Sequence, residues 1–171
     1  IDEGLVGSEM CIRDRVPAFK DCIKNLSKNT WSDFAKAIMT TDTDHKMVKH
    51  EVKIGSKKFK IIGIAKGVGM IEPNMATTLS YVFTDLKIPT IKLKKLHKKA
   101  CDKSFNVISI DGDQSPSDST ILVATGSVDI DIKRYEQKIE KELLSVFRKL
   151  SEKLVLDGEG ATKLIKINVK G

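Results

Sequence analysis

Residues 67–85, GVGMIEPNMATTLSYVFTD, join a glycine-rich loop to a segment with the composition of a strand. The first half contains two glycines, a proline and an asparagine, which are residue types that favour turns over regular structure. The second half alternates like a strand, although a helical face also fits residues 79–86. Its β-branched and aromatic residues favour the strand. We therefore expect a shaped loop that leads from Ala76, Thr77 and Thr78 into a β-strand.

Helical and strand-like periodicities alternate along the rest of the chain. Apolar residues spaced by three or four positions predict helices, and strict alternation or short β-rich runs predict strands. The expected elements are, in order, a helix at 31–39, the polar loop TTDTDHK at 40–46, a hairpin of strands 48–54 and 59–64 around Gly55 and Ser56, a helix at 90–102, a strand at 105–110, a helix at 135–154 and a strand at 164–169. Because helices and strands interleave, the fold class is α/β or α+β.

The composition fits one domain with a core, or a part of a larger domain, since 40% of the 171 residues are hydrophobic. The net charge is +7, but the lysines are spread along the chain and aromatic residues make up only 5%. The densest run, KLKKLHKK at 92–99, fits the solvent-facing side of a helix better than a phosphate-binding patch. No apolar run reaches the roughly 18 residues of a membrane span. We therefore expect neither a nucleic-acid partner nor a membrane partner.

Cysteine and histidine spacing gives no sign of a metal site. The three cysteines form no CxxC pair, and the three histidines are not spaced like zinc ligands. The segment DGDQSPSD at 111–118 begins like a calcium loop, but Pro116 and Leu122 stand where that loop needs glycine and glutamate. GIAKGVG at 63–69 lacks the spacing of a phosphate loop. The sequence predicts reduced thiols in a cytoplasmic protein, no metal, and an ordinary turn at 111–118.

Four segments, in this order and spacing, resemble the bifunctional ornithine acetyltransferase/glutamate N-acetyltransferase family of arginine biosynthesis. They are AIMTTDT at 37–43, GIAKGVGMIEPNMAT at 63–77, SFNVISIDGDQSPSD at 104–118 and DGEGATK at 157–163. The resemblance implies an α/β fold of two β-layers flanked by helices. It also implies self-cleavage between Ala76 and Thr77, followed by ping-pong acetyl transfer from N-acetylornithine to glutamate. That reaction needs no cofactor, and acetyl-CoA stays open as a second acetyl donor.

The chemistry of an N-terminal threonine explains the unusual loop. A threonine hydroxyl is a weak nucleophile unless a base removes its proton. The α-amine that cleavage would free on Thr77 has a pKa of roughly 8 and belongs to the same residue, so it serves as that base. Thr77 is therefore the expected nucleophile and the carrier of an acetyl group. Thr78 stands where the family usually has methionine and is a rival on paper, which the Ala-Thr register disfavours.

The resemblance also names the residues that would hold the substrate. Lys66 matches a lysine suited to a substrate carboxylate. Thr40 matches a substrate-binding threonine, although a shift of register leaves Thr41 or Thr43 open. Glu159 matches an acid that would hold a substrate amine. On their own, these residues look like ordinary surface and turn positions.

The family pattern also implies how the chain is organised. Residues 1–15 show neither a helical nor a strand periodicity and look non-native. Residues 16–76 match the end of an α-chain, and residues 77–171 match the start of a β-chain. The resemblance implies a heterotetramer of two α and two β chains for the full-length protein. The sequence departs from the family pattern in three places. The Thr-Gly pair that forms the family's oxyanion hole has no match here, and Glu72 stands where a histidine is commoner. The family's remaining substrate-binding residues would lie beyond Gly171. We therefore expect a piece truncated at both ends that lacks part of the family's catalytic machinery, and its own activity stays open. The rival hypotheses are an N-terminal-nucleophile aminopeptidase of similar fold and a non-enzymatic basic binding protein.

Overall fold

A computed structural model describes residues 17–27, 30–72, 78–113 and 118–169. The chain divides after Phe34 into a small unit of residues 1–34 and a larger unit of residues 35–171. The small unit contains helical residues 17–24 and the start of α2 (Trp31–Ala37). The predicted helix at 31–39 is therefore confirmed, with an end at Ala37 instead of residue 39. All the remaining elements belong to the larger unit.

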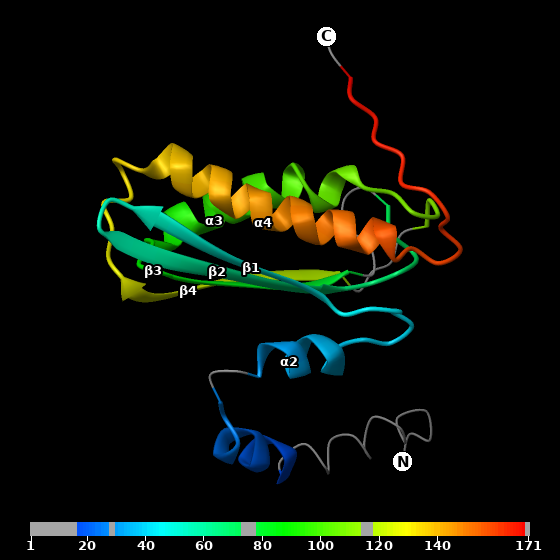
Figure 1. The fold of residues 1–171 in the computed structure, drawn as a ribbon, viewed down its shortest axis with the longest axis horizontal. Coiled ribbons are helices and arrows are strands. Elements are labelled where there is room, and N and C mark those ends of the chain that lie inside the picture. Colours follow the sequence, from blue (N-terminus) through cyan, green and yellow to red (C-terminus); the bar gives the residue numbers. More distant parts are fainter. Residues whose placement is uncertain (1–16, 28–29, 73–77, 114–117, 170–171) are drawn as a thin grey trace, which may run out of the picture. The chain divides into compact units, whose positions relative to one another are not determined.

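The larger unit is built on a four-stranded sheet in the order β1-β2-β3-β4 (Figure 1). Its strands are β1 (Lys46–Ile54), β2 (Lys57–Lys66), β3 (Leu79–Leu86) and β4 (Ser119–Val128). The first three strands pair antiparallel, and β4 pairs parallel to β3. The predicted hairpin is confirmed, since β1 and β2 are joined by Gly55 and Ser56. Gly55 has a φ of 60°, which a glycine at the first central position of a two-residue turn adopts without strain.

The strand that follows the glycine loop is also confirmed, and it starts beside the strand that precedes the loop. Lys66 at the end of β2 and Leu79 at the start of β3 are Cα partners in the antiparallel ladder. The start of β1 and the end of α4 (Glu136–Leu156) lie at the same end of the sheet (Figure 1). Segments from four parts of the chain therefore meet where the loop begins and ends.

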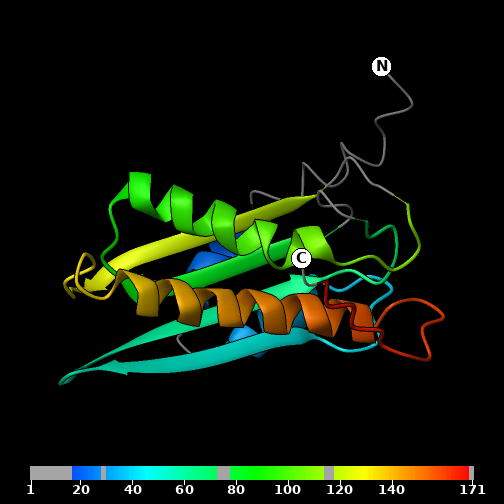
Figure 2. The same ribbon diagram turned by 90° about the horizontal axis from the view of Figure 1, so that it is seen from above.

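Two helices cover one face of the sheet. Figure 2 shows α4 running along β1 and β2, while α3 (Thr90–Asp102) runs along the β4 side. Both helices were predicted and are confirmed, with α3 at its predicted bounds. On α3, Leu96 and Ala100 are buried and most of the lysines are exposed, as expected for a solvent-facing run. Three of its lysines make ion pairs: Lys92 with Glu136, Lys98 with Asp102 and Lys99 with Glu140.

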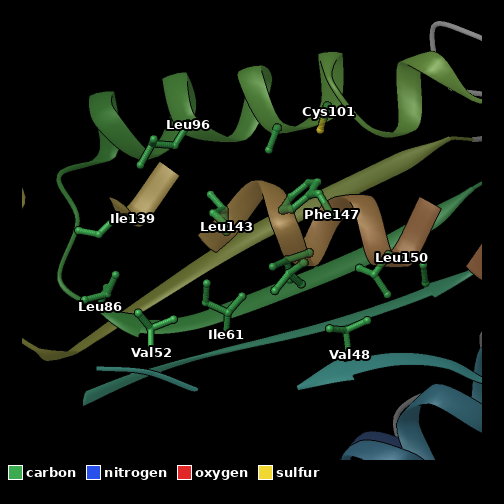
Figure 3. Packing of buried hydrophobic residues seen from close by; sticks show 14 of the residues in the cluster. Val48, Val52, Ile61, Leu86, Leu96, Cys101, Ile139, Leu143, Phe147 and Leu150 are labelled. Carbon is green, nitrogen blue, oxygen red and sulfur yellow. The ribbon is translucent and has the colours of Figure 1, made fainter. Parts of the chain in front are cut away.

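The hydrophobic core lies between this face of the sheet and the two helices. Figure 3 shows Val48, Val52 and Ile61 pointing from the strands toward the side chains of α4, among them Leu143, Phe147 and Leu150. Burial of such side chains stabilises each by about 1.5–3 kcal/mol relative to exposure. The core therefore fixes α4 across the sheet and sets where the end of that helix falls.

One position of β2 leaves no room for a side chain. A Cβ atom on Gly63 would lie 2.6 Å from Leu150 Cδ1 and 2.9 Å from Val146 Cγ1. Both of these side chains are fully buried, so they cannot move away without disturbing the core. Glycine at this position is what lets α4 approach β2 so closely.

Two predicted strands are wrong. Residues 105–110 contain the 3-10 helix η2 (Phe105–Val107), whose Phe105 is buried with its ring 5.6 Å from that of Phe147. Residues 164–169 form no strand, and Ile165 and Val169 are 79% and 91% exposed. A run of apolar or alternating residues forms a strand only where a partner edge is available. Within the described residues, neither segment has one.

The α/β class is confirmed by the sheet and the helices that cover it. The described residues contain one β-layer, so the second layer that the resemblance implies stays a prediction. No helix among the described residues has both the length and the apolar character needed to cross a membrane.

Candidate functional site

A pocket of about 260 Å³ opens at the end of the sheet where β2 finishes. Its walls come from the loop after α2, the end of β2, the glycine loop, residue 111 and the turn after α4. The lining residues are Thr40, Thr41, Lys66, Gly67, Val68, Gly69, Met70, Asp111 and Glu159. Three of the residues predicted to bind substrate, Thr40, Lys66 and Glu159, therefore lie in one pocket although up to 119 positions separate them in the sequence.

The polar groups of this pocket carry opposite charges. Lys66 Nζ donates a hydrogen bond of 3.0 Å to Thr40 Oγ1. The backbone N–H of Glu159 donates to the Val68 carbonyl at 2.7 Å, which fixes the turn after α4 against the glycine loop. A Cβ on Gly69 would lie 3.3 Å from a carboxylate oxygen of Asp111 and 3.5 Å from one of Glu159. An ammonium group, a hydroxyl and two carboxylates suit a small molecule that itself carries both charges.

The three threonines after α2 have different surroundings. Thr40 contacts Lys66 directly, and Thr41 lines the same pocket. Thr43 instead bonds to Asp157 through both its backbone N–H and its hydroxyl. Ala76 and Thr77 lie outside the described residues. Lys66 pairs with Leu79, which is two positions after Thr77 in the sequence.

Two aspartates of the segment DGDQSPSD bind backbone groups before residue 73 and after residue 77. Asp111 accepts the backbone N–H groups of Met70 and of Ile71, the latter at 3.1 Å. Asp118 accepts the N–H of Thr78, whose carbonyl accepts the Ser119 N–H at 3.0 Å. We interpreted this segment as an ordinary turn, and its anchoring role was missed. A short acidic turn carries no sign in the sequence of which distant backbone groups it will bind.

The two aspartates differ in their electrostatics. Burial would raise the pKa of Asp111, but hydrogen bonds from the backbone N–H groups of Met70, Asp113 and Ile71 and from its own outweigh it and hold that pKa below its usual value. Burial raises the pKa of Asp118, because the single N–H of Thr78 compensates only in part. Among the described residues, Asp118 Oδ2 is buried without a hydrogen-bond partner. Asp111 is therefore held as a carboxylate, whereas Asp118 takes up a proton more readily.

A buried ion network is joined to the pocket through Thr40 and Gly67, and no pattern in the sequence indicated it. The side chains of Lys46, Asp42 and Asp157 are only 2%, 1% and 11% exposed. Lys46 Nζ lies 2.6 Å from Asp42 Oδ1 and is also paired with Asp157. Asp42 additionally accepts the N–H of Gly67 at 2.7 Å and that of Thr40 at 3.2 Å. We call these three charged residues the Lys46 network.

The network lowers the pKa of both its carboxyl groups. Burial alone would raise the pKa of Asp42, but the hydrogen bonds from Lys46, Gly67 and Thr40 outweigh it. Burial would also raise the pKa of Asp157, but the hydrogen bonds from Lys46 and Thr43 outweigh it, so that this pKa is below its usual value. Both groups are therefore ionised in the folded protein near neutral pH.

This lowering predicts a loss of stability in acid. A carboxyl group whose pKa is lower in the folded than in the unfolded chain stabilises the fold above the unfolded value, which is about 3.9. That contribution is lost as the pH falls through the folded pKa.

Asp42→Asn should lower the free energy of unfolding by about 2 kcal/mol at pH 6, and should make this free energy depend less on pH between 3 and 5. Urea unfolding across this range measures both quantities. Asp113→Asn, at an exposed position, is the control, and equal pH dependence in the two variants would contradict the prediction.

In the described part of the chain, no group of three or more His, Cys, Asp or Glu side chains is placed to hold a metal ion.

Comparison with known proteins shows the family of the chain. The ArgJ family model matches residues 2–171. The chain belongs to the ArgJ family. The arginine biosynthesis bifunctional protein ArgJ of Colwellia psychrerythraea is 45% identical over 155 residues, covering 87% of this chain and 36% of that protein. The glutamate N-acetyltransferase of Methanocaldococcus jannaschii is 40% identical over 173 residues, covering 98% and 42%. The resemblance to an enzyme family of arginine biosynthesis is thereby confirmed.

The chain spans about two fifths of the length of the ArgJ relatives it matches. Among solved structures, an L-aminopeptidase D-Ala-esterase/amidase from Ochrobactrum anthropi is similar with a TM-score of 0.44 and 11% identity. That match covers 66% of this chain and 40% of the other. The likeness is too distant to bear on the activity of this ArgJ chain.

Proposed function

We propose that the full-length protein transfers an acetyl group from N-acetylornithine to glutamate through an acetyl-threonine at position 77. The observation that supports this proposal is the pocket itself. Thr40, Lys66 and Glu159, which come from separate segments, line one pocket beside the strand that follows residue 77. Membership of the ArgJ family supports the choice of substrates.

In the proposed reaction, cleavage between Ala76 and Thr77 first frees the α-amine of Thr77. This amine removes the proton of Thr77 Oγ1, which attacks the acetyl carbonyl of N-acetylornithine. The tetrahedral intermediate collapses as the ornithine nitrogen takes up the proton and leaves, so that the acetyl group stays on the threonine oxygen. The neutral amine of glutamate then attacks this ester, and the α-amine of Thr77 takes a proton from the attacking nitrogen. That proton passes to Oγ1 as the ester C–O bond breaks, so N-acetylglutamate leaves and the threonine hydroxyl is restored.

The described residues would bind and orient both substrates. The Lys66 ammonium and the Thr40 hydroxyl, which already contact each other, offer donors to a substrate carboxylate. The Glu159 carboxylate would hold a cationic amine, and Asp111 adds negative charge on the same side of the pocket. Holding the acyl donor in one orientation is what allows a weak nucleophile to react with an amide.

The remaining parts of the proposal follow the family. Residues 16–76 would end an α-chain, residues 77–171 would begin a β-chain, and two of each would form the full-length assembly. The substrates are small molecules, the location is the cytoplasm, and acetyl-CoA would serve at most as a second acetyl donor. No nucleic acid, membrane, metal or cofactor takes part in the proposed reaction.

The carboxylate of Glu159 gives the first test of this site. In the full-length protein, Glu159→Gln removes the charge that would hold the substrate amine but keeps the size of the side chain. Loss of a charged hydrogen bond costs about 1.5–3 kcal/mol, so we expect KM for N-acetylornithine to rise by about 10- to 100-fold.

Self-cleavage should continue in Glu159→Gln, because the substrate amine has no part in it, and a denaturing gel should still show two chains. Glu51→Gln, whose carboxylate pairs with Lys58 on the exposed side of β1, is the matched control. An unchanged KM in Glu159→Gln would remove Glu159 from the substrate site.

A further inference from the structure

Lys46 is a buried charged residue that the proposed reaction does not use. Its side chain is 2% exposed, and its ammonium lies between the carboxylates of Asp42 and Asp157. A buried ammonium is costly unless it is paired and hydrogen-bonded, and here both conditions are met. Such ion groups nevertheless add little net stability compared with apolar side chains of the same volume. Their geometric requirements are strict, so the main effect of this network is on the placement of the segments that it joins.

The segments joined by the Lys46 network are those that carry the pocket side chains. Asp42 Oδ2 accepts the N–H of Thr40, and Asp42 Oδ1 accepts the N–H of Gly67, the residue after Lys66. On the other side of the ammonium, Asp157 precedes Glu159 by two positions. Thr40, Lys66 and Glu159 are therefore each within two residues of a carboxylate of the network or of a backbone group bound to it.

Thr43 closes the same arrangement. Its backbone N–H donates to Asp157 Oδ2 at 3.1 Å, and its hydroxyl donates to the other oxygen of that carboxylate. The loop after α2 is thus bound to the turn after α4 twice, once through Lys46 and once through Thr43.

We propose that Lys46 is a positioning residue for the substrate pocket. Its ammonium sets the relative positions of Thr40, Lys66 and Glu159 by binding the carboxylates beside them. This inference rests on the proposed acetyl transfer for its kinetic test, but the geometry that it describes is measurable without turnover. The alternative is a purely structural role, in which Lys46 supports the fold and leaves the pocket unaffected.

The kinetic test compares Lys46→Met with Lys49→Met in the full-length protein. Lys49 lies three positions later on β1 and is exposed, so the same substitution there leaves the network intact. Assays on the two-chain form, at a temperature well below the Tm of either variant, separate substrate binding from loss of folded protein. We expect Lys46→Met to raise KM for both N-acetylornithine and glutamate by about tenfold or more, and Lys49→Met to leave both unchanged.

Thr43→Val provides a milder variant, since Lys46→Met leaves two buried carboxylates unpaired and can fail to fold. The valine keeps the shape of threonine and removes only the hydroxyl that donates to Asp157. We expect it to raise KM about three- to tenfold with a small change in Tm. If the KM values of Thr43→Val and of any folded Lys46→Met equal those of the wild type, while only Tm falls, the positioning role is wrong.

A measurement without substrate separates this inference from the proposed function. Amide hydrogen exchange at Thr40, Thr43 and Gly67 reports whether the network holds these segments. At equal global stability, these amides should exchange at least about tenfold faster in Thr43→Val or Lys46→Met than in Lys49→Met. A wild-type protein that transfers no acetyl group refutes the proposed function, and unchanged exchange refutes the role of Lys46.

Discussion

Replacing Thr77 by Ala in the full-length protein is expected to abolish self-cleavage and acetyl transfer together. Alanine removes the hydroxyl that would attack the Ala76 carbonyl, so no chain with an N-terminal amine at position 77 forms. It also removes the atom that would carry the acetyl group. Loss of a nucleophile reduces turnover by a factor on the order of 10⁴ or more. A denaturing gel and an acetyl-transfer assay measure the two effects.

Two controls show whether the effect belongs to this hydroxyl. Thr77→Ser keeps a hydroxyl beside the amine and should retain slow cleavage and some transfer. Thr78→Val removes a neighbouring hydroxyl while keeping the shape of a side chain that is buried at the start of β3, so both processes should persist. Mass spectrometry after exposure to N-acetylornithine without glutamate should find the acetyl group on residue 77. Acetyl found on another residue, or an active protein that remains a single chain, would refute the mechanism.

The largest expected effect on stability comes from Gly63 in β2. Gly63→Val would place side-chain atoms where Leu150 and Val146 of α4 already lie, since even a Cβ there would be 2.6 Å from Leu150 Cδ1. Overpacking of a core costs about 1–3 kcal/mol and occasionally more, and valine should lie at the upper end. That is a large part of the roughly 5–15 kcal/mol by which domains are stable. Chemical denaturation should therefore show a strongly lowered midpoint.

A double-mutant cycle tests the cause of this effect. Leu150→Ala alone should destabilise the protein by about 2–5 kcal/mol, because it leaves a cavity in the core. Combined with Gly63→Ala, the cavity gives the new methyl group room, so the two changes should cost at least about 1 kcal/mol less than their sum. Lys60→Ala on the exposed side of β2 should change little. Additive costs at Gly63 and Leu150 would show that the close approach of strand and helix is not what fixes glycine there.

The elements that could be predicted from the sequence are those in which the spacing of apolar residues marks the buried face. The stripe of α4 and the alternation of β1 repeat over many residues, so each reports one buried face without reference to the rest of the chain. Residues 105–110 and 164–169 were predicted as strands and are not. Their short apolar patterns are compatible with a strand, but pairing depends on whether another strand offers a free edge. That information belongs to the tertiary structure.

The candidate site was predictable only in part, for a similar reason. Lys66 and Glu159 were found through a resemblance to a family, because a single lysine after a strand and an acid in a turn have no special spacing. Lys46, Asp42 and Asp118 were missed altogether. In the sequence they stand in polar stretches that look solvated, and their importance comes from partners up to 111 positions away. Long-range hydrogen bonds to backbone groups leave no periodic signal.

The pairing of β2 with β3 has a consequence for how the protein folds. A cut between residues 76 and 77 would leave these neighbouring strands on different chains, and α4 on the second chain would still pack over β1 and β2 of the first. Each product would hold only part of one shared core, so neither would be a folding unit by itself. The precursor would therefore have to fold before it is cut. After denaturation, regain of the structure by the cut protein would be a second-order process whose rate depends on the concentration of both chains, whereas an uncut Thr77→Ala chain would refold at a rate independent of concentration.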